Sequence, residues 1–296
     1  MSVISIDGLL LKKMFVAGAN ELNKNKNMVD SLNVFPVPDG DTGTNMSLTA
    51  LAAAAECEKI DSNDISLIGK AISSGSLRGA RGNSGVIVSQ LIRGFAKGIE
   101  GKKTANAKDI ALAMTKAVET AYKAVMKPKE GTILTVAKAC AESAIKNAEQ
   151  TEDIELIFKN LIIDGNEMLS KTTEMLPALK QANVVDAGGK GLMCILEGAF
   201  KSMSIEGDIK LDAPVKKEET DFSKLNTISA ENITFGYCTE FFINVNNVKE
   251  DVVSEFKNYL TSIGDSIVVV DNEEVVKVHV HTDHPGLAIE KALTIG

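Results

Sequence analysis

Two aspartates of this chain lie in a loop whose composition suits a bound cation. In NVFPVPDGDTGTNM, residues 33–46, a single glycine separates Asp39 from Asp41, and an alanine-rich helical pattern follows at once. Carboxylates two residues apart suit a hard divalent cation such as Mg²⁺, and a helix start with free N–H groups suits phosphate. The loop therefore predicts Mg²⁺ beside a nucleotide polyphosphate, with Thr44 or Asn45 as the cap of the helix. The simpler alternative is a helix cap with spare aspartates.

Other glycine-rich turns also precede helical patterns. They are RGARGNSG, residues 78–85, DAGGKG, residues 186–191, and a third start at Thr132, which follows a glycine. Several such turns in one helical region favour loops that converge on an anion. The chain has neither a GxxxxGK[ST] loop nor a GxGxxG turn behind a strand, so the common nucleotide-binding folds are excluded by motif.

All three histidines of the chain fall within VHVHTDH, residues 278–284. On a strand, His279 and His281 would point to the same face, while Cys238 and Glu240 lie two residues apart on another predicted strand. Two imidazoles and a thiolate suit Zn²⁺, with a fourth position open to water or to Glu240. Such a site could be catalytic or could stabilise a very small sheet. The alternative is a pair of surface histidines on an edge strand.

The elements that must position these residues are mainly helical. From Leu9 to about Ile205, apolar residues recur with a spacing near 3.6 in about eight segments, which are separated by polar residues or glycine. The segments are too short for a coiled coil, so they predict a compact multi-helix bundle within a first domain, residues 1–205.

The chain beyond this bundle changes character. Residues 206–230 lose the apolar period and gather charges, which predicts a linker. Residues 231–296 then predict a small βαββα unit: strands at 236–245, 266–271 and 275–282, and helical patterns after the first and last of them. The chain stops at Gly296 just beyond a helical pattern, so we expect a C-terminal domain to be missing.

The composition bounds the classes of function. With 296 residues, 44% of them hydrophobic, the chain can form one large or two ordinary domains. A net charge of −8 and few aromatic residues make nucleic acid an unfavourable partner. The four cysteines have no paired spacing, which argues against a disulfide framework. No transmembrane-length apolar run and no basic, apolar leader are present, so a cytoplasmic location is expected.

The three motifs together resemble a known family. PDGDTGTNM, RGARGNSG and DAGGKGL at these separations are similar to the DhaL domain, the nucleotide-binding half of dihydroxyacetone kinases. NVFPVPDGDTGTNM in particular resembles the A-subunit family of fatty acid kinases, also called DAK-phosphatase or YloV-type proteins, whose middle domain fits the linker and the small domain. The resemblance implies an all-α antiparallel eight-helix barrel followed by a small α+β domain. It also implies that loops at one end of the barrel bind ATP through two Mg²⁺ ions.

The resemblance assigns roles by position. Asp39 and Asp41 would be the Mg²⁺ ligands and the catalytic carboxylates. Where DhaL domains have a further aspartate upstream, this chain offers Asn33 as the third ligand. The nucleotide would be contacted by Thr42, Gly43, Thr44, Asn45, Ser84, Gly85, Thr132, Asp186 and Gly188. The zinc interpretation also gains support, because the family's middle domain has a cysteine and an HxH pair at these places.

The implied activity is ATP-dependent transfer of the γ-phosphoryl group to a fatty acid carboxylate, which a separate fatty-acid-binding protein presents. An ionised carboxylate nucleophile needs no general base. Two alternatives stay open. One is a dihydroxyacetone-type kinase subunit, whose partner would supply the base for a hydroxyl nucleophile. The other is a zinc-dependent hydrolase or metal-binding interaction module in residues 231–296. The oligomeric state also stays open, and a homodimer is one possibility.

Overall fold

The computed structural model describes residues 2–215, 234–245, 250–271 and 275–296. The chain divides into two compact units, Met1–Tyr122 with Pro128–Ile228 and Lys123–Lys127 with Ser229–Gly296. We call the first the helical unit and the second the sheet unit, after the elements that dominate each.

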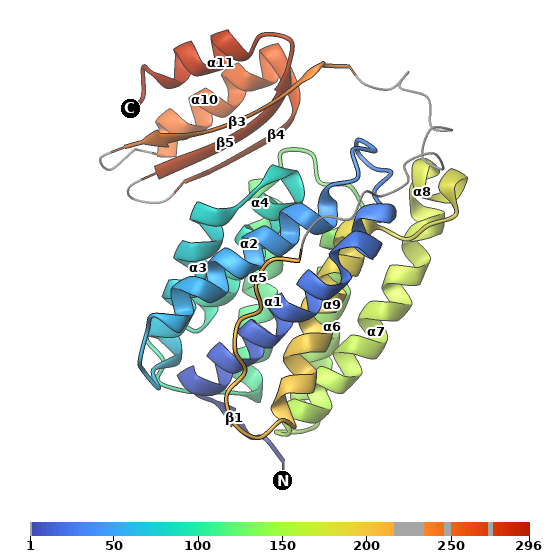
Figure 1. Ribbon diagram of the computed structural model, residues 1–296, viewed down its shortest axis with the longest axis vertical. Coiled ribbons are helices and arrows are strands. Elements are labelled where there is room, and N and C mark those ends of the chain that lie inside the picture. Colours follow the sequence, from blue (N-terminus) through green and yellow to red (C-terminus); the bar gives the residue numbers. More distant parts are fainter. Residues whose placement is uncertain (1, 216–233, 246–249, 272–274) are drawn as a thin grey trace. The chain divides into compact units, whose positions relative to one another are not determined.

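The helical unit is an antiparallel bundle in which successive long helices alternate in direction (Figure 1). Its described helices are α1 (Gly8–Ser31), α2 (Thr42–Glu58), α3 (Ile65–Gly79), α4 (Gly82–Gly98), α5 (Ala107–Ala124), α6 (Ile133–Ala148), α7 (Ile154–Met175), α8 (Pro177–Ala182) and α9 (Ala187–Met203). The predicted helical fold is confirmed, and the short α8 is an addition to the eight segments read from the sequence. In the described chain none of the helices has both the length and the apolarity needed to cross a membrane.

The first and last helices of the bundle pack against each other, and α1 also packs against α2. A Cβ atom on Gly18 would lie 2.6 Å from the backbone oxygen of Ile195, and one on Gly198 would lie 2.6 Å from that of Ala17. Because these distances are shorter than any normal contact, glycine is required on both helices for this approach. The close α1–α9 packing closes the bundle into a barrel.

An apolar cavity of about 160 Å³ lies inside the barrel, between side chains that include Met14, Ile72, Leu91, Phe158 and Ile195. No sequence pattern predicted this cavity. Pockets for drug-sized ligands have volumes of about 300–1,000 Å³, so the cavity is too small to enclose a long acyl chain in this conformation.

Two very short strands, β1 (Ser5–Ile6) and β2 (Ala105–Asn106), pair antiparallel in the helical unit. The sequence did not predict them, because two residues carry no readable period. Residues 206–215, the described part of the predicted linker, lie along α1 and are held there by hydrogen bonds. Residues 216–230 of that prediction lie outside the described residues.

The sheet unit has the predicted βαββα order. Its described elements are β3 (Tyr237–Asn244), α10 (Glu250–Ile263), β4 (Gly264–Asp271), β5 (Val275–Thr282) and α11 (Pro285–Ala292). The strands form an antiparallel sheet in the order β3-β5-β4. Val276, Val278 and Val280 of β5 lie in the core with Phe256 and Leu260 of α10. Alternate β5 residues, which include both histidines of the HxH pair, therefore occupy the opposite face of the sheet.

Candidate functional site

Four helices of the helical unit begin at the same end of the bundle (Figure 1). They are α2, α4, α6 and α9, and each follows a helix that runs toward that end. The first N–H groups of a helix have no partner within the helix, and the helix dipole places partial positive charge there. Four such starts at one end create a region that favours a polyanion.

Direct contacts link the loops that precede these helices. Val34 packs with Leu176 and Leu179, and so joins the loop before α2 to the segment before α9. The ammonium of Lys129, in the connection before α6, lies 5.1 Å from the centroid of the Phe35 ring. The loops therefore form one continuous surface and are not isolated corners.

The predicted cation ligands lie in the loop before α2. Asn33 is 2% exposed, and its Nδ2 donates a hydrogen bond to Oδ1 of Asp39 at 2.5 Å. Asp39 is exposed, whereas Asp41 is partly exposed and is the N-cap residue of α2. The structure thus pairs Asn33 with Asp39 and places Asp41 at the helix start. A loop with two carboxylates and an amide has the oxygen donors that Mg²⁺ prefers.

The capping of α2 differs from the sequence prediction. The helix begins at Thr42, so Thr44 and Asn45 lie within its first turn, and the prediction that either is its N-cap is wrong. Thr44 instead donates its backbone N–H to Oδ1 of Asp30 at 2.9 Å and its hydroxyl to Oδ2 at 2.7 Å. Asp30 is fully buried, so α1 fixes the first turn of α2 through one carboxylate.

Asp30 is not among the site residues predicted from the sequence. It follows Asn20 and Asn23 by ten and seven residues, so a helical wheel places all three on one face of α1. All three are nearly or fully buried. A polar stripe at helical spacing inside an apolar pattern was the available signal, because buried polar groups need hydrogen-bond partners.

The start of α4 lies against the start of α2. The hydroxyl oxygens of Thr42 and Ser84 are 3.4 Å apart. A Cβ atom on Gly85 would lie 2.5 Å from Oγ1 of Thr49 and 3.3 Å from the backbone oxygen of Asn45, so a side chain here would have to displace Thr49. In the described chain the buried Oδ1 of Asn83 has no hydrogen-bond partner. An unsatisfied acceptor at a helix start is an observation that a bound cation or a ligand hydroxyl would explain.

Gly43 has a packing role. A Cβ atom at this position would collide with the backbone oxygen of Lys26, so α2 can approach α1 only with glycine there. Contact of Gly43 with a phosphate stays a prediction. The described contacts explain the glycine by the α1–α2 approach alone.

Thr132 and Asp186 lie at the starts of α6 and α9. Thr132 is the N-cap residue of α6 and accepts the backbone N–H of Leu134 at 3.4 Å. Asp186 is the N-cap residue of α9, is 5% exposed, and accepts the N–H of Gly189 at 2.7 Å. The backbone N–H of Ile133, the first residue of α6, also acts on this carboxyl and lowers its pKa. The carboxylate therefore interacts with two helix starts, and direct contact of Asp186 or Gly188 with nucleotide stays a prediction.

Asp186 should make the stability of the helical unit depend on pH. Burial raises the pKa of its carboxyl from an ordinary 3.8 to about 6, although two backbone N–H groups act in the opposite direction. The folded state therefore holds this proton more tightly than the unfolded state, so the stabilisation is complete below about pH 4 and is lost as the pH rises through about 6. Asp186→Asn removes the titration while keeping an acceptor oxygen.

The measurement is urea unfolding of both proteins at a series of pH values. Relative to Asp186→Asn, the wild type should lose on the order of 1–3 kcal/mol of unfolding free energy between about pH 4 and 6.5. Parallel pH profiles for the two proteins would contradict the assignment.

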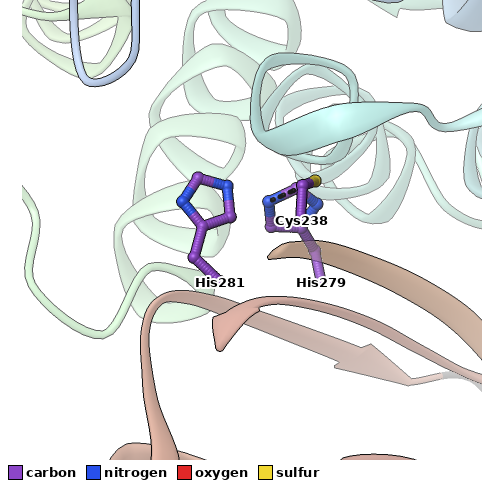
Figure 2. A group of neighbouring side chains, drawn as sticks. All are labelled: Cys238, His279 and His281. Carbon is purple, nitrogen blue, oxygen red and sulfur yellow. Dashed lines mark hydrogen bonds between the residues drawn. The ribbon is translucent and has the colours of Figure 1, made fainter. Parts of the chain in front are cut away.

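A second site lies on the sheet face that is opposite the β5 valines. Cys238 of β3 pairs in register with His281 of β5, and Glu240 pairs with His279, so the four side chains share that face. One ligand atom from each of Cys238, His279 and His281 lies within 4.8 Å of the other two (Figure 2). This meets the geometric condition for the predicted zinc site, because a single ion could contact all three atoms.

An acidic side chain lies near each imidazole. Nε2 of His279 lies 3.9 Å from the Cys238 sulfur, and its Nδ1 lies 3.5 Å from Oε2 of Glu240. Nδ1 of His281 lies 3.9 Å from a carboxylate oxygen of Asp265. A carboxylate behind one ring nitrogen leaves the other free to bind a metal, and this arrangement is common around zinc. Glu240 also accepts a hydrogen bond from Nζ of Lys277 at 2.8 Å, so it supports the cluster from outside.

The cluster also favours the ligand form of the cysteine. Hydrogen bonding to His279 and then to His281 lowers the pKa of the Cys238 thiol to about 6. Burial acts to lower the pKa of His279, but its interactions with Cys238 and Glu240 act in the opposite direction and together outweigh burial. The pKa of His279 is therefore raised to about 9. The thiolate is therefore accessible near neutral pH, and it is the thiolate that binds zinc.

Comparison with known proteins agrees with both units. Residues 36–201 match the family model of the DAK2 domain, and residues 234–296 match the model of the FakA-like middle domain, which is named after the A subunit of fatty acid kinases. Uncharacterized proteins of Staphylococcus aureus strains USA300 and COL are each 47% identical to the chain over 293 residues, which is 96% of this chain and 53% of theirs. The chain thus spans about half the length of the curated relatives it matches.

A solved structure shares the fold of the helical unit. It is the dihydroxyacetone kinase from C. freundii in complex with AMP-PNP and Mg²⁺, with a TM-score of 0.50 and 15% identity, and the match covers 65% of this chain and 34% of that one. At this identity the likeness concerns the fold.

Proposed function

Because this chain belongs to the DAK2-domain family, we propose that it is the ATP-dependent kinase subunit of a fatty acid kinase. It would transfer the γ-phosphoryl group of ATP to a fatty acid carboxylate and so form an acyl phosphate. The observation that carries the proposal is the convergence of four helix starts, α2, α4, α6 and α9, at the end of the bundle that holds Asp39 and Asp41. The match to the FakA-like middle domain supports the carboxylate acceptor.

The nucleotide phosphates would lie over the adjoining starts of α2 and α4. The backbone N–H groups of Thr42 and Gly43, which precede the Thr44 N–H that Asp30 accepts, would bind them, together with the hydroxyls of Thr42 and Ser84, which are 3.4 Å apart. Asp30 holds Thr44 through two hydrogen bonds, so this turn is ordered before a ligand arrives. Groups that are already oriented lose little entropy on binding and during reaction.

The residues that would hold Mg²⁺ are Asp39, Asp41 and Asn33. Bound there, Mg²⁺ would neutralise negative charge on the phosphoryl group during transfer. The hydrogen bond from Asn33 restrains the Asp39 carboxylate, and the unsatisfied Oδ1 of Asn83 adds an oxygen acceptor at the start of α4. This set fits the ion, because all of these donors are hard oxygen atoms.

The test of the nucleotide site is calorimetric titration of the 296-residue chain with ATP, with and without Mg²⁺. We expect one ATP to bind per chain only when Mg²⁺ is present. Equal affinity in the presence of a chelator would argue against the carboxylate loop as the cation site. An absence of binding under both conditions would argue against the nucleotide site itself.

The acceptor should depend on a partner. The internal cavity of about 160 Å³ is too small for a long acyl chain, so a separate fatty-acid-binding protein would present the carboxylate. With Mg·ATP, acyl phosphate formation from free fatty acid should be at least about 100-fold slower than with the acyl-loaded partner, since in-line transfer needs a positioned acceptor. Acyl phosphate is measured as hydroxamate. Equal rates would contradict the partner requirement, and phosphorylation of dihydroxyacetone in a parallel assay would favour the alternative acceptor.

The Cys238, His279 and His281 cluster would bind Zn²⁺ in the sheet unit. Three protein ligands leave a fourth position for water or a further group, and the sheet unit is small enough to gain stability from a metal. A carboxylate near each imidazole favours a structural role for this ion beside the kinase function.

A further inference from the structure

Residues 205–215 follow α9 and run beside α1 as an extended segment, which we call the strap (Figure 1). Most of its side chains are exposed, and Ile209 and Leu211 are half-buried. Burial of apolar side chains therefore contributes little to its position. Hydrogen bonds from polar side chains of α1 hold it instead.

Asn20 holds the middle of the strap. Its Nδ2 donates to the backbone oxygen of Lys210 at 2.8 Å, and its Oδ1 accepts the backbone N–H of Asp212 at 2.9 Å. One side-chain amide thus pairs with residues i and i+2 of an extended segment, as a neighbouring β-strand would. Asn20 is only 5% exposed, so it depends on these partners.

Asn23 repeats this pairing one turn later and adds a third contact. Its Nδ2 donates to the oxygen of Ala213 at 2.9 Å, and its Oδ1 accepts the N–H of Val215 at 3.1 Å. The same Oδ1 accepts the hydroxyl of Ser47 in α2 at 3.2 Å. Asn23 and Ser47 are 0% and 1% exposed. One buried oxygen atom therefore joins the strap to the helix whose start carries the proposed phosphate site.

The next turn of α1 also touches both elements. Nζ of Lys26 donates to the backbone oxygen of Val215, and the backbone oxygen of Lys26 lies directly under Gly43. One turn further on, Asp30 holds Thr44. Three successive turns of α1 therefore hold α2, and the first two of them also hold the strap.

From these contacts we propose that the strap controls the nucleotide site, with Asn23 as the positioning residue between them. A docked strap fixes the Asn23 amide, Asn23 holds Ser47, and α2 keeps its first turn in the position that binds phosphate. Release of the strap frees Asn23 and lowers the affinity for Mg·ATP. The proposal rests on the proposed nucleotide site at the start of α2.

Release of the strap does not require the barrel to unfold. Water can replace the hydrogen bonds of its exposed backbone groups, because most of the strap residues are exposed. The strap therefore has two accessible states, docked and released, and in the docked state both polar groups of Asn23 have strap partners.

Two substitutions in the full chain separate the steps of this coupling. Asn20→Ala loosens the strap at a residue that has no described hydrogen bond to α2. Ser47→Ala removes the hydrogen bond between α2 and Asn23, which we call the bridge, and leaves every strap contact in place. Asn25→Ala is the matched control, because Asn25 lies on α1 and donates to the backbone oxygen of Glu21 within that helix. The measured quantities are the Kd for Mg·ATP by calorimetry and, without nucleotide, hydrogen exchange of the backbone amides in the strap and at residues 44–47.

We expect each single substitution to raise the Kd about fivefold, and the double variant to resemble the weaker-binding single variant, because both act through one bridge. If the Kd of the double variant rose by the product of the two single fold-changes, the proposal would be overturned. Without nucleotide, Asn20→Ala should speed exchange in the strap and at residues 44–47 by at least about threefold, whereas Asn25→Ala should change neither. Unchanged exchange at residues 44–47 in Asn20→Ala would overturn the coupling. If the chain bound no ATP, that result would refute only the proposed nucleotide site, and the exchange measurement would still test the coupling.

Discussion

Asp39→Asn or Asp41→Asn should weaken Mg²⁺-dependent ATP binding by at least about 100-fold, because each removes one of the two charges that would attract the cation. The fold should be retained. Asp39 is exposed, and Asp41 caps α2 without a side-chain cap hydrogen bond, while Asp30 supplies the cap contact. The same variants should lose phosphoryl transfer with the acyl-loaded partner.

The measurements are calorimetric titration with ATP and Mg²⁺, circular dichroism at 222 nm, and the hydroxamate assay. Asp61→Asn is the matched control, since Asp61 is an exposed aspartate in the connection between α2 and α3, at the other end of the bundle. Wild-type affinity in either loop variant would rule out these carboxylates as essential ligands. A loss of helicity together with binding would instead assign them a folding role.

His281→Ala or Cys238→Ser should remove stoichiometric zinc from the sheet unit. Each deletes one of three ligand atoms that lie within 4.8 Å of one another, so the metal affinity should fall by at least about 100-fold. Since metal binding is linked to folding, the sheet unit should then melt at a lower temperature. Affinity for Mg·ATP should be nearly unchanged, because the proposed nucleotide ligands belong to the helical unit.

Metal content is measured by inductively coupled plasma mass spectrometry, and stability by thermal unfolding with and without a chelator. His284→Ala provides the matched control, because His284 is the N-cap residue of α11 and lies outside the three-residue cluster. If purified wild-type protein held no stoichiometric transition metal, the cluster would be a thiolate–imidazole pair without an ion. Unchanged zinc content in His281→Ala would remove that residue from the ligand set.

The sequence predicted the elements wherever a period was long enough to read. The strand 275–282 agrees with the structure at both ends, since VVKVHVHT alternates without interruption. That Cys238 faces the same side as His279 depends on the register of β3 with β5, which alternation within each strand does not provide. The alternative of surface histidines on an edge strand is wrong, because β5 is the central strand of the sheet. Period and alternation are local properties, so a single sequence reveals them.

What the sequence could not provide was the set of long-range partners. Asp30 acts on Thr44 across the whole loop, and Asn20 reaches residues that are 190 or more positions away. Nothing in a local window identifies such a pair. The role of Asp186 was similarly hidden, because one of the two backbone N–H groups that act on its carboxyl belongs to Ile133, at a distant helix start. Polar residues at buried helical positions were the one signal that could have directed attention to α1.

The closure of the barrel by α1 and α9 has a consequence for how the chain folds during synthesis. Helix α1 leaves the ribosome well before α9 and the strap, yet it packs against α9 and contacts the strap, with Glu21 and Lys201 paired across 180 positions. Contacts so distant in sequence form slowly, because a long loop must close before they give any stabilisation. The growing chain should therefore carry an incomplete barrel, with the buried polar face of α1 uncovered, until about residue 215 has emerged. During that interval a chaperone that covers α1 would protect the nascent protein from aggregation.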